Sequence, residues 1–257
     1  MVQDGHDNEL EIQLRELCLT QSVFPIKYSF LDVQSPGLAR NNGLGHATGT
    51  WICFWDSDDE GEVNNVYNAV TSADSHVNVI VGAYSVAYTD MRGNEVKKIA
   101  KESSLYGVFR ELAWWRIVFR SRRLEDRKFQ AWRMGEDQAF VMELNIKSSE
   151  ILFCSDTFYT YYSGRRGQLT QNEGARRELI PCLDYMINWL VEEEVPGSVS
   201  ASIVRRQIIT LCKNYPSQLS VVLKRLIFQS KSNAGFSAPI RILNLIRTLA
   251  SRKLDED

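Results

Sequence analysis

The stretch "WICFWDSDDE", residues 51–60, joins a run of large apolar residues to a run of carboxylates. Residues 51–55 predict a strand that is buried on both faces, because a short, continuous apolar run is typical of a strand inside a sheet. Residues 56–60 then carry four carboxylates. Like charges this close repel and raise one another's pKa unless a positive group lies among them. The stretch therefore predicts a cation at the end of this strand.

The residues of the acidic cluster leave two interpretations open. In the first, Asp58 or Asp59 caps a helix that starts near Glu62, and the other carboxylates favour the positive end of that helix. In the second, Asp56 and Asp58 hold Mg²⁺ or Mn²⁺ and leave room for the phosphate oxygens of a substrate. The second interpretation would supply the missing positive charge.

Outward from this stretch, patterns typical of strands and helices alternate. We expect a helix capped by Asp7 or Asn8, a strand at 26–33, a short helix from Pro36 to a glycine stop at Gly49 and a strand at 50–56. After these we expect a helix carrying Val63, Val66, Tyr67 and Val70 on one face, a β-meander at 77–99, a helix after Gly135 and a strand at 150–164. From about residue 174 the pattern is helical only. This order predicts an α/β domain followed by an all-helical C-terminal extension.

The composition is ordinary for a soluble globular protein, with 44% hydrophobic and 24% charged residues. A net charge of -2 gives no reason to expect a nucleic-acid partner. The five cysteines lie far apart with no metal-binding spacing, which predicts buried thiols in a reducing compartment. No apolar run approaches the length of a membrane span, and the N-terminus shows no signal-peptide pattern. We therefore expect a cytoplasmic protein, soluble or attached peripherally to the inner face of the membrane.

A second acidic site, Glu136-Asp137, follows Gly135 and precedes a helical pattern. An N-cap explains one carboxylate but not two. Upstream lies a group of arginines that forms either a solvated face or a surface that attracts a phosphorylated substrate. These are Arg116, Arg120, Arg122, Arg123, Arg127 and Arg133.

Three segments, in this order and at these separations, resemble glycosyltransferase family 2: "GLARNNGLGHATGTWICFWDSDD" (37–59), "WWRIVFRSRRL" (114–124) and "MGEDQAF" (134–140). In addition, "VQDGHDN" (2–8) looks like the family's nucleotide-binding turn, and "FYTYYSGRRGQLT" (158–170) like its later strand and basic loop. The resemblance implies a GT-A-like, Rossmann-like fold, with a mixed central sheet flanked by helices. We expect a glycosyltransferase domain over residues 1–173 and a helical region over 174–257.

The resemblance implies a role for each matching residue. Asp4 looks like the carboxylate that contacts the nucleotide base, and Arg40 like the arginine beside the nucleotide. Asp56, nearer the ribose, and Ser57 would belong to the same donor site. Asp58, together with Asp56, matches the metal-binding DxD motif.

On the acceptor side, Asp137 matches the general base, with Glu136 beside it. The resemblance implies an inverting, metal-dependent transfer from a UDP-, GDP- or dTDP-linked sugar to a hydroxyl of a saccharide or lipid-linked acceptor, in surface polysaccharide biosynthesis. A Mn²⁺ or Mg²⁺ ion at Asp58 would neutralise the charge that the departing diphosphate gains. A carboxylate within reach of the acceptor hydroxyl would take its proton.

The sequence departs from the family pattern at its start. The family places a strand and a helix before the turn at Asp4, whereas this sequence begins at the turn, and Gln3 stands where an acidic residue is common. A strand edge left exposed in this way invites self-pairing, so a homo-oligomer stays open. The alternative function is a truncated, catalytically impaired relative that acts as a binding or scaffolding protein. A third class, a phosphatase or nucleotidyltransferase with an Asp-x-Asp magnesium site, leaves the segments around Arg40 and Glu136 unexplained.

The helical region after residue 174 matches no motif. Its apolar stripes predict a small bundle packed against the catalytic domain. The alternative is a surface that meets a lipid-linked acceptor, a partner protein or the membrane.

Overall fold

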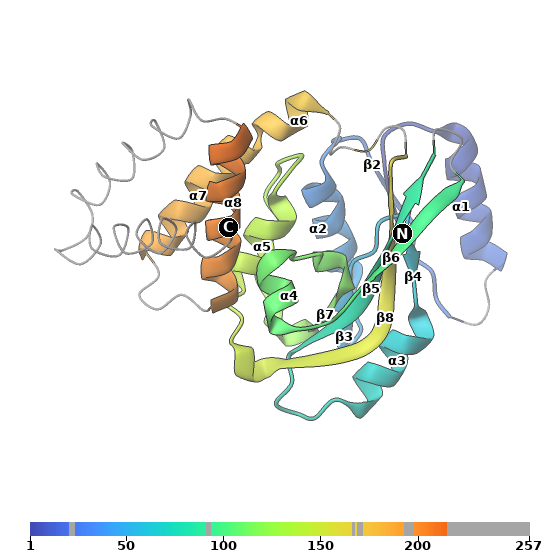
Figure 1. Ribbon diagram of the computed structural model, residues 1–257. Coiled ribbons are helices and arrows are strands. Elements are labelled where there is room, and N and C mark those ends of the chain that lie inside the picture. Colours follow the sequence, from blue (N-terminus) through green and yellow to red (C-terminus); the bar gives the residue numbers. More distant parts are fainter. Residues whose placement is uncertain (21–23, 91–93, 166–167, 169–171, 193–197, 215–257) are drawn as a thin grey trace.

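The computed structural model describes residues 1–20, 24–90, 94–165, 168, 172–192 and 198–214. The order of elements is β1 (Val2–Asp4), α1 (Asn8–Thr20), β2 (Ser29–Leu31), α2 (Pro36–His46), β3 (Trp51–Cys53), β4 (Glu60–Gly61), α3 (Val63–Ser72), β5 (Val79–Thr89), β6 (Glu95–Lys101), α4 (Leu105–Arg110), η1 (Trp114–Arg116), β7 (Ile117–Arg120), η2 (Ser121–Arg123), α5 (Glu136–Glu143), η3 (Ser148–Glu150), β8 (Ile151–Ser163), α6 (Glu173–Arg177), α7 (Leu179–Glu192) and α8 (Ser198–Asn214). Figure 1 shows this arrangement, with α1 at one end of the molecule and α7 and α8 at the other.

The described strands form two sheets. β1 and β2 pair in parallel, with Val2 opposite Ser29 and Asp4 opposite Leu31. The larger sheet has the order β3-β7-β5-β8-β4, and β6 also pairs with β5. In this sheet β8 runs parallel to β5, whereas the other pairs are antiparallel. The prediction of a mixed sheet in an α/β fold is confirmed.

Helices cover both faces of the larger sheet. Successive side chains of β5 point to opposite faces, so β5 contributes to a core on each side. Val79 and Val81 lie in the core that includes residues of α5, α7 and α8. Ile80 lies in a second cluster with Phe158 of β8 and Ala69 of α3. The sheet thus separates α3 from α5, which carries the second acidic site (Figure 1).

The helices after residue 173 pack directly on α5. Cys182 and Met186 of α7 and Ile203 of α8 share a core cluster with Phe140 and other buried residues of α5. Two further predicted apolar stripes, at 219–227 and 240–249, lie outside the described residues. The division into domains at residue 173 stays a prediction. No described helix is both long and apolar enough to cross a membrane.

Three local predictions are wrong. The stretch from Trp51 to Trp55 is half-buried rather than buried on both faces, because β3 lies at the end of the sheet order and pairs only with β7 among the described strands. The helix after Pro36 ends at His46, with Ala47 as its C-cap, instead of at Gly49. Cys18, Cys53 and Cys154 are half-buried rather than buried, whereas Cys182 is buried as predicted.

Strand β7 lies within the basic, aromatic segment 111–134, for which the sequence predicts no strand. It has four residues, Ile117–Arg120, between two 3₁₀ turns, yet it lies between β3 and β5 in the sheet. Four residues are too few to show a period-2 pattern, and arginines stand at position 116 and at the last position of the strand. The pairing with β3 and β5, rather than the local sequence, makes this segment a strand.

Candidate functional site

The two predicted acidic segments converge on one cation, Arg40. Its Nη2 donates to Asp56 Oδ1 at 3.0 Å, and its Nη1 donates to Glu136 Oε1 at 2.5 Å. The side chains of Arg40 and Glu136 are 16% and 6% exposed, so this is a buried ion pair. Burial disfavours the Arg40 cation, but Asp56 and Glu136 outweigh burial and raise its pKa. Part of the positive charge that the acidic stretch requires is therefore a side chain of the protein itself.

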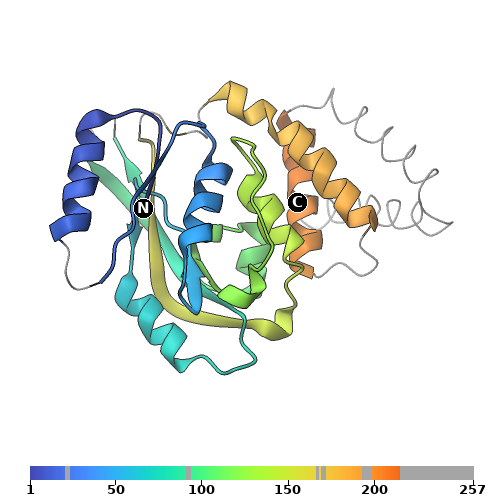
Figure 2. The ribbon, with the colours of Figure 1, turned by 180° about the vertical axis from the view of Figure 1, so that it is seen from behind.

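The first turns of α2 fix Arg40 in place. Ser35 is the N-cap, and its hydroxyl accepts a backbone N–H of the first turn at 3.3 Å. Gly37 lies so close to the loop before α5 that a Cβ there would be 2.0 Å from the carbonyl oxygen of Gln130. The Arg40 guanidinium lies over the Trp114 ring, 4.6 Å from its centroid. Figure 2 shows α2 beside α5 in the middle of the molecule.

Glu136 and Asp137 begin α5, directly after Gly135. Gly135 has a φ of 89°, and a Cβ on it would lie 2.6 Å from Cys182 Sγ, so both conformation and space require glycine. Burial raises the pKa of Glu136 to about 7; Asp137 adds to the rise, and Arg40 opposes it. Burial also raises the pKa of Asp137, and the nearby Arg40 cation only partly opposes this rise. Two adjacent carboxyl groups with raised pKa values suit proton transfer near neutral pH.

The acidic turn after β3 is held by β8 and not by helix capping. The Asp59 carboxylate accepts hydrogen bonds from the Tyr159 hydroxyl and the Tyr162 backbone N–H, each at 2.8 Å. The Asp56 N–H donates to the same Tyr159 hydroxyl at 3.1 Å. Burial raises the pKa of Asp59 to about 6, and these two donors oppose the rise. The residue at the N-cap of α3 is Glu62, without a side-chain bond, so the capping interpretation is wrong.

Asp58 and Ser57 are exposed at this turn. The Asp58 carbonyl oxygen accepts a hydrogen bond from Arg165, a second cation near the cluster. Within the described part of the chain, no group of three or more His, Cys, Asp or Glu side chains could hold a metal ion. The donor set that the sequence predicts consists of two carboxylates, those of Asp56 and Asp58. Two carboxylates fit a hard cation whose remaining ligands are phosphate oxygens and water.

Asp4 organises the loop that leads into α2. Its carboxylate accepts three backbone N–H groups, from Val33 at 2.8 Å, Gln34 at 2.9 Å and Ser35 at 2.7 Å. Because Ser35 is the N-cap of α2, Asp4 helps to fix the start of the helix that carries Arg40. The contact of Asp4 with a nucleotide base stays a prediction.

The departure at Gln3 has a structural reason. Gln3 is 6% exposed, and its amide nitrogen donates to the carbonyl oxygens of Gly5 and Asp7 at 3.0 and 3.1 Å. Its amide oxygen accepts from the Tyr28 hydroxyl at 3.0 Å. An ionised acid here could accept from Tyr28 but could not donate to the two carbonyl groups.

Three of the upstream arginines are structural. Arg116 is 1% exposed and donates hydrogen bonds to backbone carbonyl oxygens. Arg120 donates hydrogen bonds to the backbone carbonyl oxygens of residues 74 and 77. Arg123 donates to Leu144 O and pairs with Glu150. The guanidinium groups of these three arginines form hydrogen bonds that connect strands and loops. Neither predicted interpretation, a solvated face or a surface that attracts phosphate, is therefore right for them.

Helix α8 supplies a residue that sequence analysis missed. Arg206 Nη2 donates to Gln138 Oε1 at 3.0 Å, one residue beyond Asp137. Its Nη1 is buried and, among the described residues, has no hydrogen-bond partner. Burial lowers the pKa of Arg206, while Asp137 opposes this, and Arg206 in turn favours the charged form of Asp137. No sequence signal marks Arg206, because it lies in a helical pattern without a motif.

The structure thus brings four predicted site residues together and leaves three at the margin. Those together are Arg40, Asp56, Glu136 and Asp137. Those at the margin are Asp58 and Ser57, exposed on the same turn as Asp56, and Asp4, beneath the loop before α2.

Comparison with known proteins supports the predicted family. Residues 1–139 match the family model for glycosyl transferase family 2. The "Glycosyltransferase GlyA" of Streptococcus pneumoniae serotype 4 is 21% identical over 80% of this chain and 33% of its own length. The "Cholesterol galactosyltransferase" of Borreliella burgdorferi is 23% identical over 67% of this chain and 53% of its own length. The chain thus spans about a third and about half of these two relatives.

Solved structures share the fold. S. aureus TarS (residues 1–349) in complex with UDP-GlcNAc has a TM-score of 0.62 at 16% identity, covering 96% of this chain and 70% of that one. The mannosyltransferase PcManGT of Pyrobaculum calidifontis, in complex with GDP-Man and Mn²⁺, has a TM-score of 0.53 at 15% identity, covering 98% and 70%. These likenesses confirm the predicted GT-A-like fold.

Proposed function

The chain belongs to glycosyl transferase family 2, and from this premise we propose that it transfers a sugar from a nucleotide diphosphate donor to a hydroxyl group, with inversion at the anomeric carbon. The observation that carries the proposal is the pairing of Arg40 with both Asp56 and Glu136. This pairing brings the acidic turn of the donor side next to the carboxyl pair of the acceptor side.

The donor in this proposal is a UDP-, GDP- or dTDP-linked sugar. Support comes from the neighbours in fold, whose structures contain UDP-GlcNAc or GDP-Man with Mn²⁺. The acceptor is a saccharide or lipid-linked saccharide of surface polysaccharide biosynthesis. Cytoplasmic location, membrane attachment and self-association stay predictions.

On the donor side, Asp58 and Asp56 would hold a Mn²⁺ or Mg²⁺ ion. Such an ion, when bound, neutralises the negative charge that the departing nucleoside diphosphate gains. The protein's own part is to keep the turn in position through Asp59 and Tyr159. Arg40 orients the Asp56 carboxylate by donating a hydrogen bond to its Oδ1. The other oxygen of Asp56 and the exposed carboxylate of Asp58 remain for the cation.

On the acceptor side, Asp137 takes the proton of the acceptor hydroxyl. The freed oxygen forms the new bond to the anomeric carbon while the bond to the diphosphate oxygen breaks, and its electron pair leaves with the nucleoside diphosphate. Attack opposite the leaving group inverts the anomeric centre. Glu136 stays paired with Arg40, so the role of base falls to Asp137, whose carboxylate accepts from the Gln138 N–H at 2.8 Å.

Calorimetric titration with UDP, GDP and dTDP, with and without Mn²⁺, tests the proposal. We expect one nucleotide to bind more tightly with Mn²⁺, and Asp58→Asn to remove that increment. Asp137→Asn is the matched control, since it makes the same change in the second acidic segment. It should leave nucleotide binding nearly intact and remove transfer from the matching nucleotide-sugar.

Equal loss of binding in both variants would contradict this division of roles. Failure of the wild-type protein to bind any of the three nucleotides would favour the alternative, a catalytically impaired relative that acts as a scaffold.

A further inference from the structure

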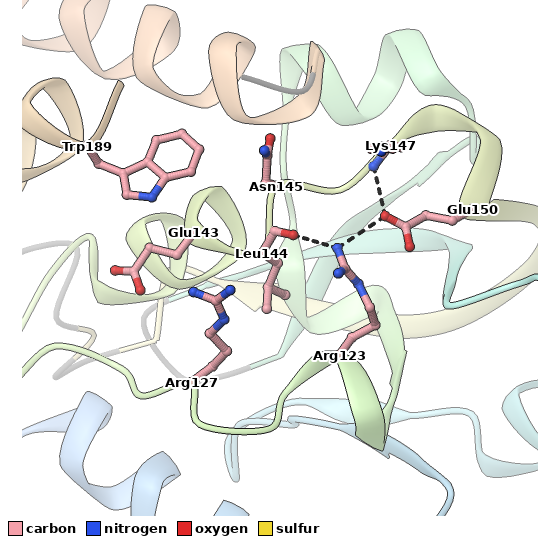
Figure 3. Close-up of a pocket in the computed structure, with 8 residues that line it drawn as sticks. All are labelled: Arg123, Arg127, Glu143, Leu144, Asn145, Lys147, Glu150 and Trp189. Atoms are coloured by element: carbon pink, nitrogen blue, oxygen red, sulfur yellow. Dashed lines mark hydrogen bonds and ion pairs between the residues drawn. The ribbon is translucent and has the colours of Figure 1, made fainter. Parts of the chain in front are cut away.

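A pocket lies at the end of α5 that is opposite to Glu136 and Asp137. It has a volume of about 380 Å³, within the range of small-molecule sites. Residues before and after α5 line it, among them Arg123, Arg127 and Lys147, and Trp189 of α7 closes one side. Figure 3 shows the indole on one side of the hollow and the two guanidinium groups on the other. An eight-residue helix is roughly 12 Å long, so this pocket is separate from the paired carboxyl groups.

One wall of the pocket is held rigidly. Arg123 donates to Leu144 O at 2.5 Å and pairs with Glu150 Oε1 at 3.2 Å. Glu150 also accepts from the Lys147 backbone N–H at 2.9 Å and from Asn78 Nδ2 at 2.9 Å. These bonds use both oxygens of Glu150, so its negative charge is compensated inside the wall. A site with a fixed wall loses less entropy when it binds a ligand.

Two cations of the pocket are not used by the fold. Arg127 and Lys147 are both exposed, and among the residues that the structure describes neither forms an ion pair with a carboxylate. In the wall, Arg123 Nε is buried, again with no hydrogen-bond partner among the described residues. Unpaired arginine and lysine at the rim of a hollow suit a phosphate or a carboxylate, and the planar guanidinium can bind either with two hydrogen bonds.

The other two groups suit a hydroxylated ring. Trp189 offers a half-buried indole, which can cover an apolar ring face. Glu143 accepts the Tyr185 hydroxyl with Oε1 at 2.5 Å, which fixes the carboxylate and leaves Oε2 to accept hydroxyl groups. An aromatic plane, a hydroxyl acceptor and two cations thus lie around one hollow.

We propose that this pocket binds a sugar residue that carries a phosphate or carboxylate group. The ring lies against Trp189, its hydroxyls donate to Glu143, and its anionic group binds Arg127 and Lys147. The role of this sugar rests on the proposed function. The sugar is a unit of the acceptor chain that lies distant from the hydroxyl that reacts. The acceptor is then an anionic saccharide.

The test is binding, measured in the absence of any donor. Wild-type protein is titrated by calorimetry with glucose 6-phosphate and glucuronic acid, and with glucose, inorganic phosphate and AMP as comparison ligands. We expect one of the two anionic sugars to bind more tightly than all three comparison ligands. In the double variant Arg127→Met/Lys147→Met the affinity for that sugar should fall by about tenfold or more. Trp189→Ala should weaken it by about fivefold.

Lys128→Met is the matched control, since Lys128 is exposed beside Arg127 but does not line the pocket. It should bind the anionic sugar as the wild type does. The proposal is overturned if the double variant keeps wild-type affinity, or if phosphate or AMP binds as tightly as the anionic sugars and Trp189→Ala changes nothing.

The two proposals fail separately. If the anionic sugar binds but no nucleotide does, the proposed transfer reaction is wrong and the pocket stands. If nucleotide binds and transfer occurs but the pocket variants leave sugar binding unchanged, only the pocket proposal is wrong.

Discussion

Arg40 lies between two carboxylates that belong to different elements, and it is stacked on an aromatic ring. Such a cation is costly to remove, because its loss leaves Glu136 buried without a partner. Arg40→Met should lower the free energy of unfolding by about 3–5 kcal/mol. Urea unfolding followed by circular dichroism measures this loss.

The control for this substitution is Arg15→Met. Arg15 also pairs with a glutamate, Glu11, but its side chain is 60% exposed. An exposed pair of this kind contributes less than about 1 kcal/mol. If both variants lost the same stability, the Arg40 pair would not be the buried ion pair described above.

Glu136 should make stability depend on pH. Burial raises its pKa from 4.5 to about 7, so between these pH values the folded protein keeps a proton that the unfolded chain has lost. Stability from this group is therefore present at low pH and falls as the pH rises from about 4.5 to 7. Glu136→Gln lacks this loss, so its free energy of unfolding relative to wild type should increase over the same window. Unfolding curves at several pH values measure it.

Glu173→Gln serves as the control for Glu136→Gln, because the Glu173 side chain is 76% exposed. Its stability relative to wild type should not change over this pH window. A constant difference for Glu136→Gln as well would contradict the raised pKa.

At the scale of elements, α2 is the part whose position decides the site. Gly37→Ala would place a methyl group 2.0 Å from the Gln130 carbonyl oxygen, so α2 must move away from the loop before α5. We expect a loss of about 1–3 kcal/mol in the free energy of unfolding from overpacking. Nucleotide affinity should fall with it, because α2 carries Arg40.

Gly45→Ala in the same helix is the matched control. A Cβ at Gly45 meets nothing within 4 Å, so the substitution should gain roughly 0.5–1 kcal/mol from helix propensity. Denaturant unfolding and nucleotide titration of both variants measure the contrast. If Gly45→Ala lowered the free energy of unfolding as much as Gly37→Ala, the close approach of Gly37 to Gln130 would not be the cause of the loss.

At the scale of the whole molecule, the C-terminal helices and the second acidic segment form one unit. Arg206 of α8 is bonded to Gln138 and favours the charged form of Asp137. Arg206→Met should raise the pKa of Asp137 further, so the acidic limb of the pH–rate profile should move to higher pH. Arg206→Lys, which keeps the charge, should move it less. A fall in rate that is uniform over all pH values would indicate a structural role alone.

The sequence determined the kind and the order of several elements, because these depend on local patterns. The helix after Gly135, the strand at 150–164 and the two-stranded meander at 77–99 have periods and turn residues that act within one segment. The ordered motifs also determined the family, which the match over residues 1–139 bears out.

Only the tertiary structure decided what each charged group contacts. The partner of Asp56 is Arg40 and that of Asp59 is Tyr159, and both contacts join segments distant in sequence. β7 is a strand because β3 and β5 flank it, and Arg206 reaches Gln138 because α8 packs on α5. Local patterns report the burial and period of a segment, whereas the partner of a charge depends on which surfaces meet once the chain is folded.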